Sequence, residues 1–136
     1  MTDEELFTRA IAISAKAHVP YSKFRVGAAL TTTDGRMYAG ANIENASYPE
    51  GWCAETSAIA HMVCDWNGTI DRIAVYSPNL AEITPCGGCR QRIAEFAHPE
   101  TVILLGDDSG PTRKVTISDL LPFAFSDRAL RGETPT

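Results

Sequence analysis

Three cysteines and one glutamate have the residue types and the spacing that could do chemistry in this 136-residue chain. Cys53 and Glu55 stand two residues apart in NIENASYPEGWCAETSAIA (42–60), where a turn-rich stretch gives way to a helical pattern. Cys86 and Cys89 stand one helical turn apart in PCGGC (85–89), which is chelate spacing. Alone, Cys53 would suit core packing, because free cysteine is among the most often buried residue types. Alone, a Cys-x-x-Cys pair fits zinc, a redox dithiol or chance.

The positions of all three cysteines favour a metal site over a redox pair. Each is expected at the start of a helix, where partial positive charge and free N–H groups stabilise thiolate over thiol. A redox motif would follow the first strand of a thioredoxin-like unit, whereas Cys86 and Cys89 come late in the chain. The pattern therefore predicts one zinc ion per chain, bound by Cys53, Cys86 and Cys89.

The fourth cysteine and the histidines are expected to stay outside this site. Cys64 lies eleven residues after Cys53 on the same predicted helix, about 16 Å along its axis, so we expect it to fill the core. His61 is excluded by nearly the same distance, and His18 and His98 are expected to be exposed at helix ends. Three protein ligands leave zinc an open position, where a bound water has a pKa of about 7.

Glu55 is the candidate for moving the proton of that water. A glutamate in the first turn of a helix is often there only because the helix dipole favours it. Here it follows a predicted zinc ligand by two residues, close enough to reach bound water without binding the metal. Cys-x-Glu together with Pro-Cys-x-x-Cys resembles the signature of zinc deaminases that act on nucleobases. The resemblance implies that Glu55 is the general acid and base.

Periodicity and turn signals give the elements that must position these residues. Helical patterns cover 2–18, 52–66, 87–97 and 116–122, and strand patterns cover 24–33, 36–43, 72–78, 101–105 and 113–117. Asp34 and Gly35 predict an antiparallel hairpin between the first two strands, and strands then alternate with helices. This order predicts an α/β fold, a three-layer α/β/α sandwich with a mixed sheet of about five strands.

Length, composition and charge exclude several classes of protein. The chain length suits one domain over residues 1–136, which ends in a short polar tail, 131–136. No stretch approaches the roughly 20 apolar residues of a membrane span, so we expect no membrane contact. A net charge of −5 disfavours nucleic-acid binding. The acidic N-terminus lacks the pattern of an export signal, so we expect a reducing, cytoplasmic location.

Five segments together resemble the cytidine deaminases of the short, all-cysteine, homotetrameric type, in the same order and over nearly the whole chain. They are VPYSKFRVGAAL (19–30), NIENASYPEG (42–51), CAE (53–55), PCGGCRQ (85–91) and LLPFAF (120–125). The resemblance implies zinc-dependent hydrolysis of cytidine and deoxycytidine to the uracil nucleosides and ammonia, in pyrimidine salvage. It implies that Glu55 carries a proton from water to ring N3 and later to the departing ammonia. It also implies a homotetramer in which Phe125, otherwise expected in the core, reaches into a neighbour's pocket.

The resemblance further implies how a nucleoside would be held. Asn42 and Glu44 match residues that hold the sugar hydroxyls, which both donate and accept hydrogen bonds. Phe24 matches a residue against which the base lies, and the backbone near Ala54 and Thr84 is placed beside the base and its amine. Without the resemblance, Asn42 and Glu44 would be interpreted as polar residues at the end of a strand, and Phe24 as a residue that packs within a strand.

Thr56 marks the clearest departure from that family pattern, which continues with an arginine after CAE. Three thiolates on Zn²⁺ leave one net negative charge, and a threonine can donate a hydrogen bond but no charge. Arg90 directly follows Cys89 in the same first turn. We predict that Arg90 shares the charge compensation, the alternative being an exposed helical arginine.

Three other functions are compatible with part of the pattern. A tRNA adenosine deaminase usually reads His-Ala-Glu and needs a surface for RNA, whereas this chain reads Cys-Ala-Glu and is acidic. A blasticidin-type deaminase shares the zinc motif, but the segments 22–30 and 42–51 resemble nucleoside-binding ones. A non-catalytic zinc-stabilised interaction domain would use four protein ligands and would be indifferent to loss of Glu55.

Overall fold

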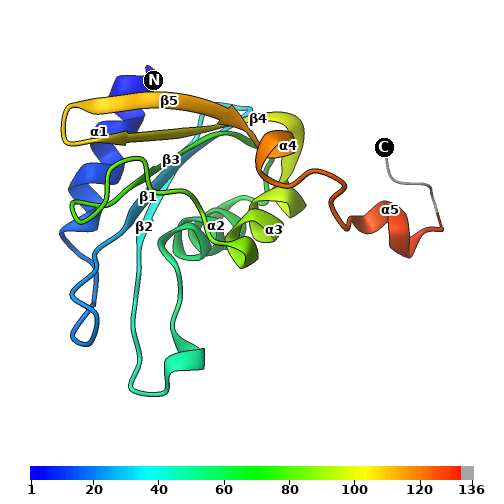
Figure 1. Ribbon diagram of the computed structural model, residues 1–136. Helices are drawn as coiled ribbons and strands as arrows, with labels where there is room; N and C mark the ends of the chain where they lie inside the picture. Colours follow the sequence, from blue (N-terminus) through cyan, green and yellow to red (C-terminus); the bar gives the residue numbers. More distant parts are fainter. Residues whose placement is uncertain (133–136) are drawn as a thin grey trace.

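Five strands form one mixed sheet with helices on both faces (Figure 1). The computed structural model describes residues 1–132, so part of the predicted polar tail, 133–136, lies outside the described residues. The elements in chain order are α1 (Asp3–Ser14), β1 (Gly27–Thr32), β2 (Met37–Ala41), the 3₁₀ helix η1 (Tyr48–Glu50), α2 (Ala54–Asp65), β3 (Ile70–Tyr76), α3 (Gly87–Phe96), β4 (Ala97–Asp107), β5 (Gly110–Thr116), α4 (Ile117–Leu120) and α5 (Asp127–Leu130).

The strands lie in the order β2-β1-β3-β4-β5. The central pair β3 and β4 is parallel, and every other neighbouring pair is antiparallel. The last predicted strand, β5, is at the edge of the sheet, as expected. The predicted α/β sandwich with a mixed five-stranded sheet is confirmed.

Successive side chains of β1 point to opposite faces of the sheet, and each face carries its own apolar core. Ala29 packs with α1, whereas Ala28 and Leu30 pack with α2 and α3. All six residues of β1 are buried, as expected of a strand covered on both faces. The buried residues that the helices contribute to these cores are Leu6, Phe7 and Ala10 from α1, Ala54, Ala58, Ile59 and Met62 from α2, Ile93 from α3 and Ile117 from α4.

Two glycines allow helices to approach the first two strands closely. A Cβ atom at Gly27 would lie 2.1 Å from the carbonyl oxygen of Ala10 in α1. A Cβ atom at Gly40 would lie 2.4 Å from the backbone nitrogen of Ala58 in α2. The first half of α2 therefore rests directly on β2.

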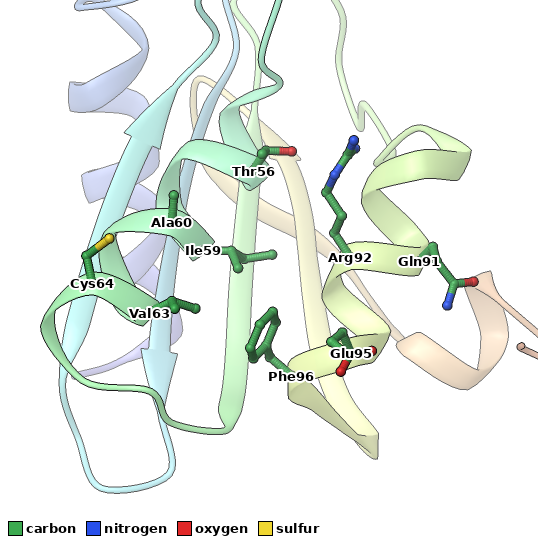
Figure 2. A pocket seen from close by; sticks show the side chains of 9 residues that line it. All are labelled: Thr56, Ile59, Ala60, Val63, Cys64, Gln91, Arg92, Glu95 and Phe96. Atoms are coloured by element: carbon green, nitrogen blue, oxygen red, sulfur yellow. The ribbon is translucent and has the colours of Figure 1, made fainter. Parts of the chain in front are cut away.

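The structure corrects three details of the sequence-based interpretation. Cys64 is exposed and does not fill the core. Val63, expected in the buried stripe of the same helix, is also exposed, because both side chains border a groove between α2 and α3 (Figure 2). Helix α5 was not predicted from the sequence. None of the helices within residues 1–132 is long and apolar enough to cross a membrane.

Candidate functional site

The starts of α2 and α3 meet because of the topology of the sheet. Helix α2 leads into β3 and helix α3 leads into β4. Since β3 and β4 are parallel neighbours, the two helices run in the same direction and begin at the same end of the sheet. Figure 1 shows them side by side on one face. Residues 33 positions apart in the sequence are thereby brought together.

Three cysteine sulfurs converge at these two helix starts. Cys53 is the N-cap residue of α2, Cys86 is the N-cap residue of α3, and Cys89 lies in the first turn of α3. Their Sγ atoms all lie within 4.8 Å of one another, with Cys53 and Cys86 3.9 Å apart. The three cysteines that the spacing predicted as ligands therefore form one cluster.

The two cap positions leave their side chains available for a metal. An N-cap is usually Ser, Thr, Asp or Asn, whose oxygen accepts a hydrogen bond from the first turn. In the described part of the chain, neither Cys53 nor Cys86 makes such a bond. The helix starts contribute partial positive charge, which favours thiolate at both positions.

The sulfurs are too close to lose all their protons without a cation. A hydrogen bond with Cys89 lowers the pKa of Cys53. The same hydrogen bond, followed by burial, raises the pKa of Cys89. A divalent ion removes this repulsion, and soft thiolate ligands suit zinc. The cluster contains three sulfurs, the number of protein ligands typical of a catalytic zinc site with one open position. The donor set therefore fits Zn²⁺.

Glu55 lies beside the cluster in the first turn of α2 and is only 4% exposed. Burial raises the pKa of its carboxyl group, whereas its own backbone N–H, the neighbouring Cys89 and the Arg92 cation lower the pKa. A buried carboxyl group whose pKa is raised above its ordinary value accepts a proton more readily than an exposed one. This is the property required of the predicted general acid and base.

Thr56 and Arg90 differ in their relation to the sulfurs. The Oγ1 atom of Thr56 lies 3.7 Å from the Sγ atom of Cys89, within hydrogen-bonding reach for sulfur. Arg90 instead donates from Nε to the carbonyl oxygen of Pro85 at 2.8 Å and from Nη1 to that of Leu120 at 3.0 Å. Arg90 thus supports the loop before α3 and the end of α4, and these hydrogen bonds do not serve the sulfurs.

Arg92 is the cation at this site that the sequence interpretation missed. Its charge reaches the Glu55 carboxyl group. Arg92 also lines the groove between α2 and α3 together with Thr56 (Figure 2). The signal was present in the sequence, because Arg92 lies three residues after Cys89 and therefore on the same face of α3.

The two residues predicted to hold a sugar also organise the backbone around them. Asn42 accepts a hydrogen bond from the N–H of Val26 at 2.9 Å and donates one to the carbonyl oxygen of Phe24 at 2.8 Å. The Oε1 atom of Glu44 accepts hydrogen bonds from the N–H groups of Tyr21 and Ser22, both at 3.0 Å. Hydrogen bonds from Ser22 and the Tyr21 backbone lower the pKa of Glu44, so it is ionised at neutral pH.

The remaining predicted contact residues lie in different surroundings. Phe24 is half-buried in the segment before β1, and Ala54 is fully buried at the start of α2. Thr84 is exposed in the loop that leads to Cys86 and Cys89. Phe125 is 62% exposed near the C-terminal end of the described chain. Their contacts with a substrate remain predictions.

Together, the sandwich fold, the three-cysteine cluster and the buried Glu55 define the class of zinc-dependent deaminases. Residues 1–105 match the family model described as "Cytidine and deoxycytidylate deaminase zinc-binding region". This match covers more than half of the chain. The chain therefore belongs to the family of cytidine and deoxycytidylate deaminases.

Individual relatives match nearly the full length of the chain. The cytidine deaminase of Halalkalibacterium halodurans is 41% identical over 93% of this chain and 96% of its own. That of Sporosarcina psychrophila is 40% identical over 96% of both chains. Among solved structures, the cytidine deaminase from Burkholderia pseudomallei has a TM-score of 0.86 and 40% identity, covering 92% of this chain and 100% of its own.

Proposed function

We propose that this protein is a zinc-dependent hydrolase that converts cytidine and deoxycytidine to uridine and deoxyuridine with release of ammonia. The observation that carries the proposal is the buried Glu55 beside three cysteine sulfurs within 4.8 Å of one another. Membership of the deaminase family and relatives described as cytidine deaminases support it. A role in pyrimidine salvage follows from this reaction.

The protein's own residues account for the proton transfers of the reaction. Zn²⁺ held by Cys53, Cys86 and Cys89 supplies the Lewis acidity that makes a water molecule nucleophilic near neutral pH. Glu55 accepts a proton from the water that attacks C4 of the cytosine ring and delivers it to ring N3. Glu55 then accepts the second proton of that water and passes it to the amino group, which leaves as ammonia. Burial keeps the carboxyl group away from competing solvent protons.

The hydrogen bonds around Asn42 and Glu44 support recognition of the sugar. Glu44 uses Oε1 for the backbone of Tyr21 and Ser22, which leaves Oε2 to accept from a hydroxyl group. Asn42 retains one amide hydrogen and one acceptor lone pair after its two backbone bonds. We assign both residues to the ribose, the Phe24 ring to the base, and the backbone at Ala54 and Thr84 to the amide edge.

We propose a homotetramer in which Phe125 completes a neighbour's site. The C-terminal segment that carries Phe125 and α5 extends away from the sheet in Figure 1. Phe123 and Phe125 are 94% and 62% exposed, which is unusual for two aromatic rings so close in sequence. Gln91 donates a hydrogen bond of 2.8 Å to the carbonyl oxygen of Phe125, which ties the segment to α3. The proposed location is the cytoplasm, where thiols stay reduced and able to bind zinc.

The proposal is tested by measuring ammonia release from a panel of compounds. Cytosine, cytidine, deoxycytidine, deoxycytidylate, adenosine and blasticidin should be offered to the zinc-loaded protein. Activity on the two cytosine nucleosides, with little on free cytosine or adenosine, is the expected result. Activity confined to deoxycytidylate, to adenosine or to blasticidin would replace the substrate assignment. No ammonia from any compound would contradict an enzymatic role.

A further inference from the structure

The Arg92 side chain lies against the first turn of α3, beside Gly88. Its Nη1 atom is 3.0 Å from the position that a Cβ atom on Gly88 would occupy. Gly88 stands between Cys86 and Cys89 in the sequence. The absence of a side chain at Gly88 therefore leaves room for the guanidinium group beside the metal-binding turn.

Thr56 faces the same groove from the other helix. Both residues line the groove between α2 and α3, and Figure 2 shows the Arg92 side chain extending toward the level of Thr56. Thr56 in turn contacts the sulfur of Cys89 at 3.7 Å. The Arg92 guanidinium therefore shares a groove with Thr56, whose hydroxyl contacts a cysteine sulfur but carries no charge.

The Arg92 guanidinium is available for such a role. Within residues 1–132 it makes no salt bridge or hydrogen bond, although Glu95 lies one helical turn away on the same helix. Arg90, by contrast, is held by the carbonyl oxygens of Pro85 and Leu120. Of these two arginines of α3, only Arg92 leaves its guanidinium without a hydrogen bond in the described part of the chain, and its side chain lies beside Gly88 in the metal-binding turn.

We propose that Arg92 supplies the positive charge that balances the zinc–thiolate centre. It acts from across the groove that it shares with Thr56, the uncharged residue that stands where the family pattern has an arginine. Zn²⁺ with three thiolates carries one net negative charge, and a cation nearby lowers the energy of that centre. Arg92 is a positioning residue, since it acts through the ligands and not on the substrate. The inference rests on the proposed zinc site.

The test compares zinc retention in four variants with that of the parent protein. Each zinc-loaded protein is titrated with a chromophoric chelator, and the zinc that it retains gives a relative affinity. Residues next to metal ligands typically change affinity by about 10- to 100-fold. We expect Arg92→Gln to weaken zinc binding by about 10-fold and Arg92→Lys by less. The double variant Thr56→Arg with Arg92→Gln should regain most of the loss, because the charge returns from the opposite helix.

Arg9→Gln is the matched control, because Arg9 is an exposed arginine on α1, on the other face of the sheet. It removes the same charge from the protein and should leave zinc affinity unchanged. The Arg92→Gln effect should also shrink at high ionic strength, since an exposed charge is screened by salt. A loss of packing would not depend on salt in this way.

A second readout reports on the sulfurs without any turnover. In the cobalt-substituted protein, positive charge near the thiolates raises the energy of the sulfur-to-cobalt charge-transfer absorption. Arg92→Gln should shift this absorption to longer wavelength, and the double variant Thr56→Arg with Arg92→Gln should reverse the shift. Unchanged zinc affinity and an unchanged cobalt spectrum in Arg92→Gln would overturn the role of Arg92. Failure of the parent protein to bind zinc would instead overturn the site itself.

Discussion

The side-chain amide of Asn42 donates a hydrogen bond of 2.8 Å to the carbonyl oxygen of Phe24, the residue expected to lie against the base. The same amide accepts from the N–H of Val26 at 2.9 Å, so it fixes the chain on both sides of Arg25. One side chain at the end of β2 thereby determines where β1 begins and where the Phe24 ring is presented. We therefore expect recognition of the sugar and recognition of the base to be coupled through this residue.

Replacement of Asn42 tests this coupling. Asn42→Asp keeps the acceptor for Val26 but places an oxygen against the Phe24 carbonyl, and loss of this part-buried hydrogen bond costs roughly 1–3 kcal/mol. We expect KM for cytidine to rise about 10-fold or more with a smaller change in kcat. Asn67→Asp, on an exposed residue after α2, should leave both constants unchanged. An Asn42→Asp variant with the parental KM would show that the coupling is unimportant.

Glu55→Gln should preserve the fold and the zinc while removing most of the deamination. Glutamine has nearly the size of glutamate but cannot accept the proton of the attacking water. General acid and base groups contribute about 10²- to 10⁴-fold in rate, and in the proposed mechanism Glu55 acts in more than one transfer. The check is kcat for cytidine together with zinc content on the same sample. Turnover near the parental rate would eliminate Glu55 as the proton carrier, and a rate lowered only by loss of zinc would show a structural role.

Much of this site could be predicted from the sequence because its chemistry depends on local patterns. Cys53, Cys86 and Cys89 are recognisable from their spacing and from their places at helix starts. The position of Cys64 was wrong because helical periodicity does not show which side of α2 is covered by α3. Arg90 and Arg92 illustrate the same difficulty, since both follow Cys89 closely and only three-dimensional packing shows which one is held by Pro85 and Leu120. Side-chain direction in the first turns of neighbouring helices depends on tertiary contacts that no single pattern encodes.

Zinc stoichiometry distinguishes the ligands from the remaining thiol. Cys86→Ala removes one of three sulfurs and should reduce bound zinc well below the roughly one ion per chain expected of the parent protein. Cys64→Ala is the matched control, because Cys64 is an exposed cysteine on the same pair of helices. It should retain full zinc and full activity. Elemental analysis after dialysis against a chelator measures both, and equal zinc in the two variants would contradict the ligand assignment.

Asp3 links the start of α1 to the sheet and should make stability depend on pH. It forms salt bridges with Lys114 at 2.7 Å and Arg72 at 2.8 Å, and the hydrogen bonds from Lys114 and Arg72 lower its pKa. A lowered pKa in the folded state gives stability that is present above the unfolded value, about 3.9, and is lost as pH falls through the folded value. Asp3→Asn should therefore reduce the free energy of unfolding by about 1 kcal/mol at neutral pH.

Urea unfolding from pH 7 down to pH 3 measures this effect. The difference between Asp3→Asn and the parent should narrow as the solution becomes acidic. Glu4→Gln changes a neighbouring carboxylate that is exposed in the same helical turn, and it should have a smaller effect at every pH. A constant difference across the range would mean that Asp3 stabilises through its shape and not through its charge.

Mixed tetramers give the sharpest test of the proposed role of Phe125. If Phe125 of one chain completes the site of a neighbour, Phe125→Ala should raise KM for cytidine without loss of zinc, because no ligand is touched. Glu55→Gln chains should be inactive but should still present a normal Phe125 to their neighbours. Unfolding and refolding the two variants together should create sites that combine an intact Glu55 with an intact Phe125, and activity at low cytidine should exceed the sum of the separate variants. Light scattering should report tetramers for each preparation. A monomer, or mixtures that show only the sum of the two activities, would place Phe125 outside its neighbour's site.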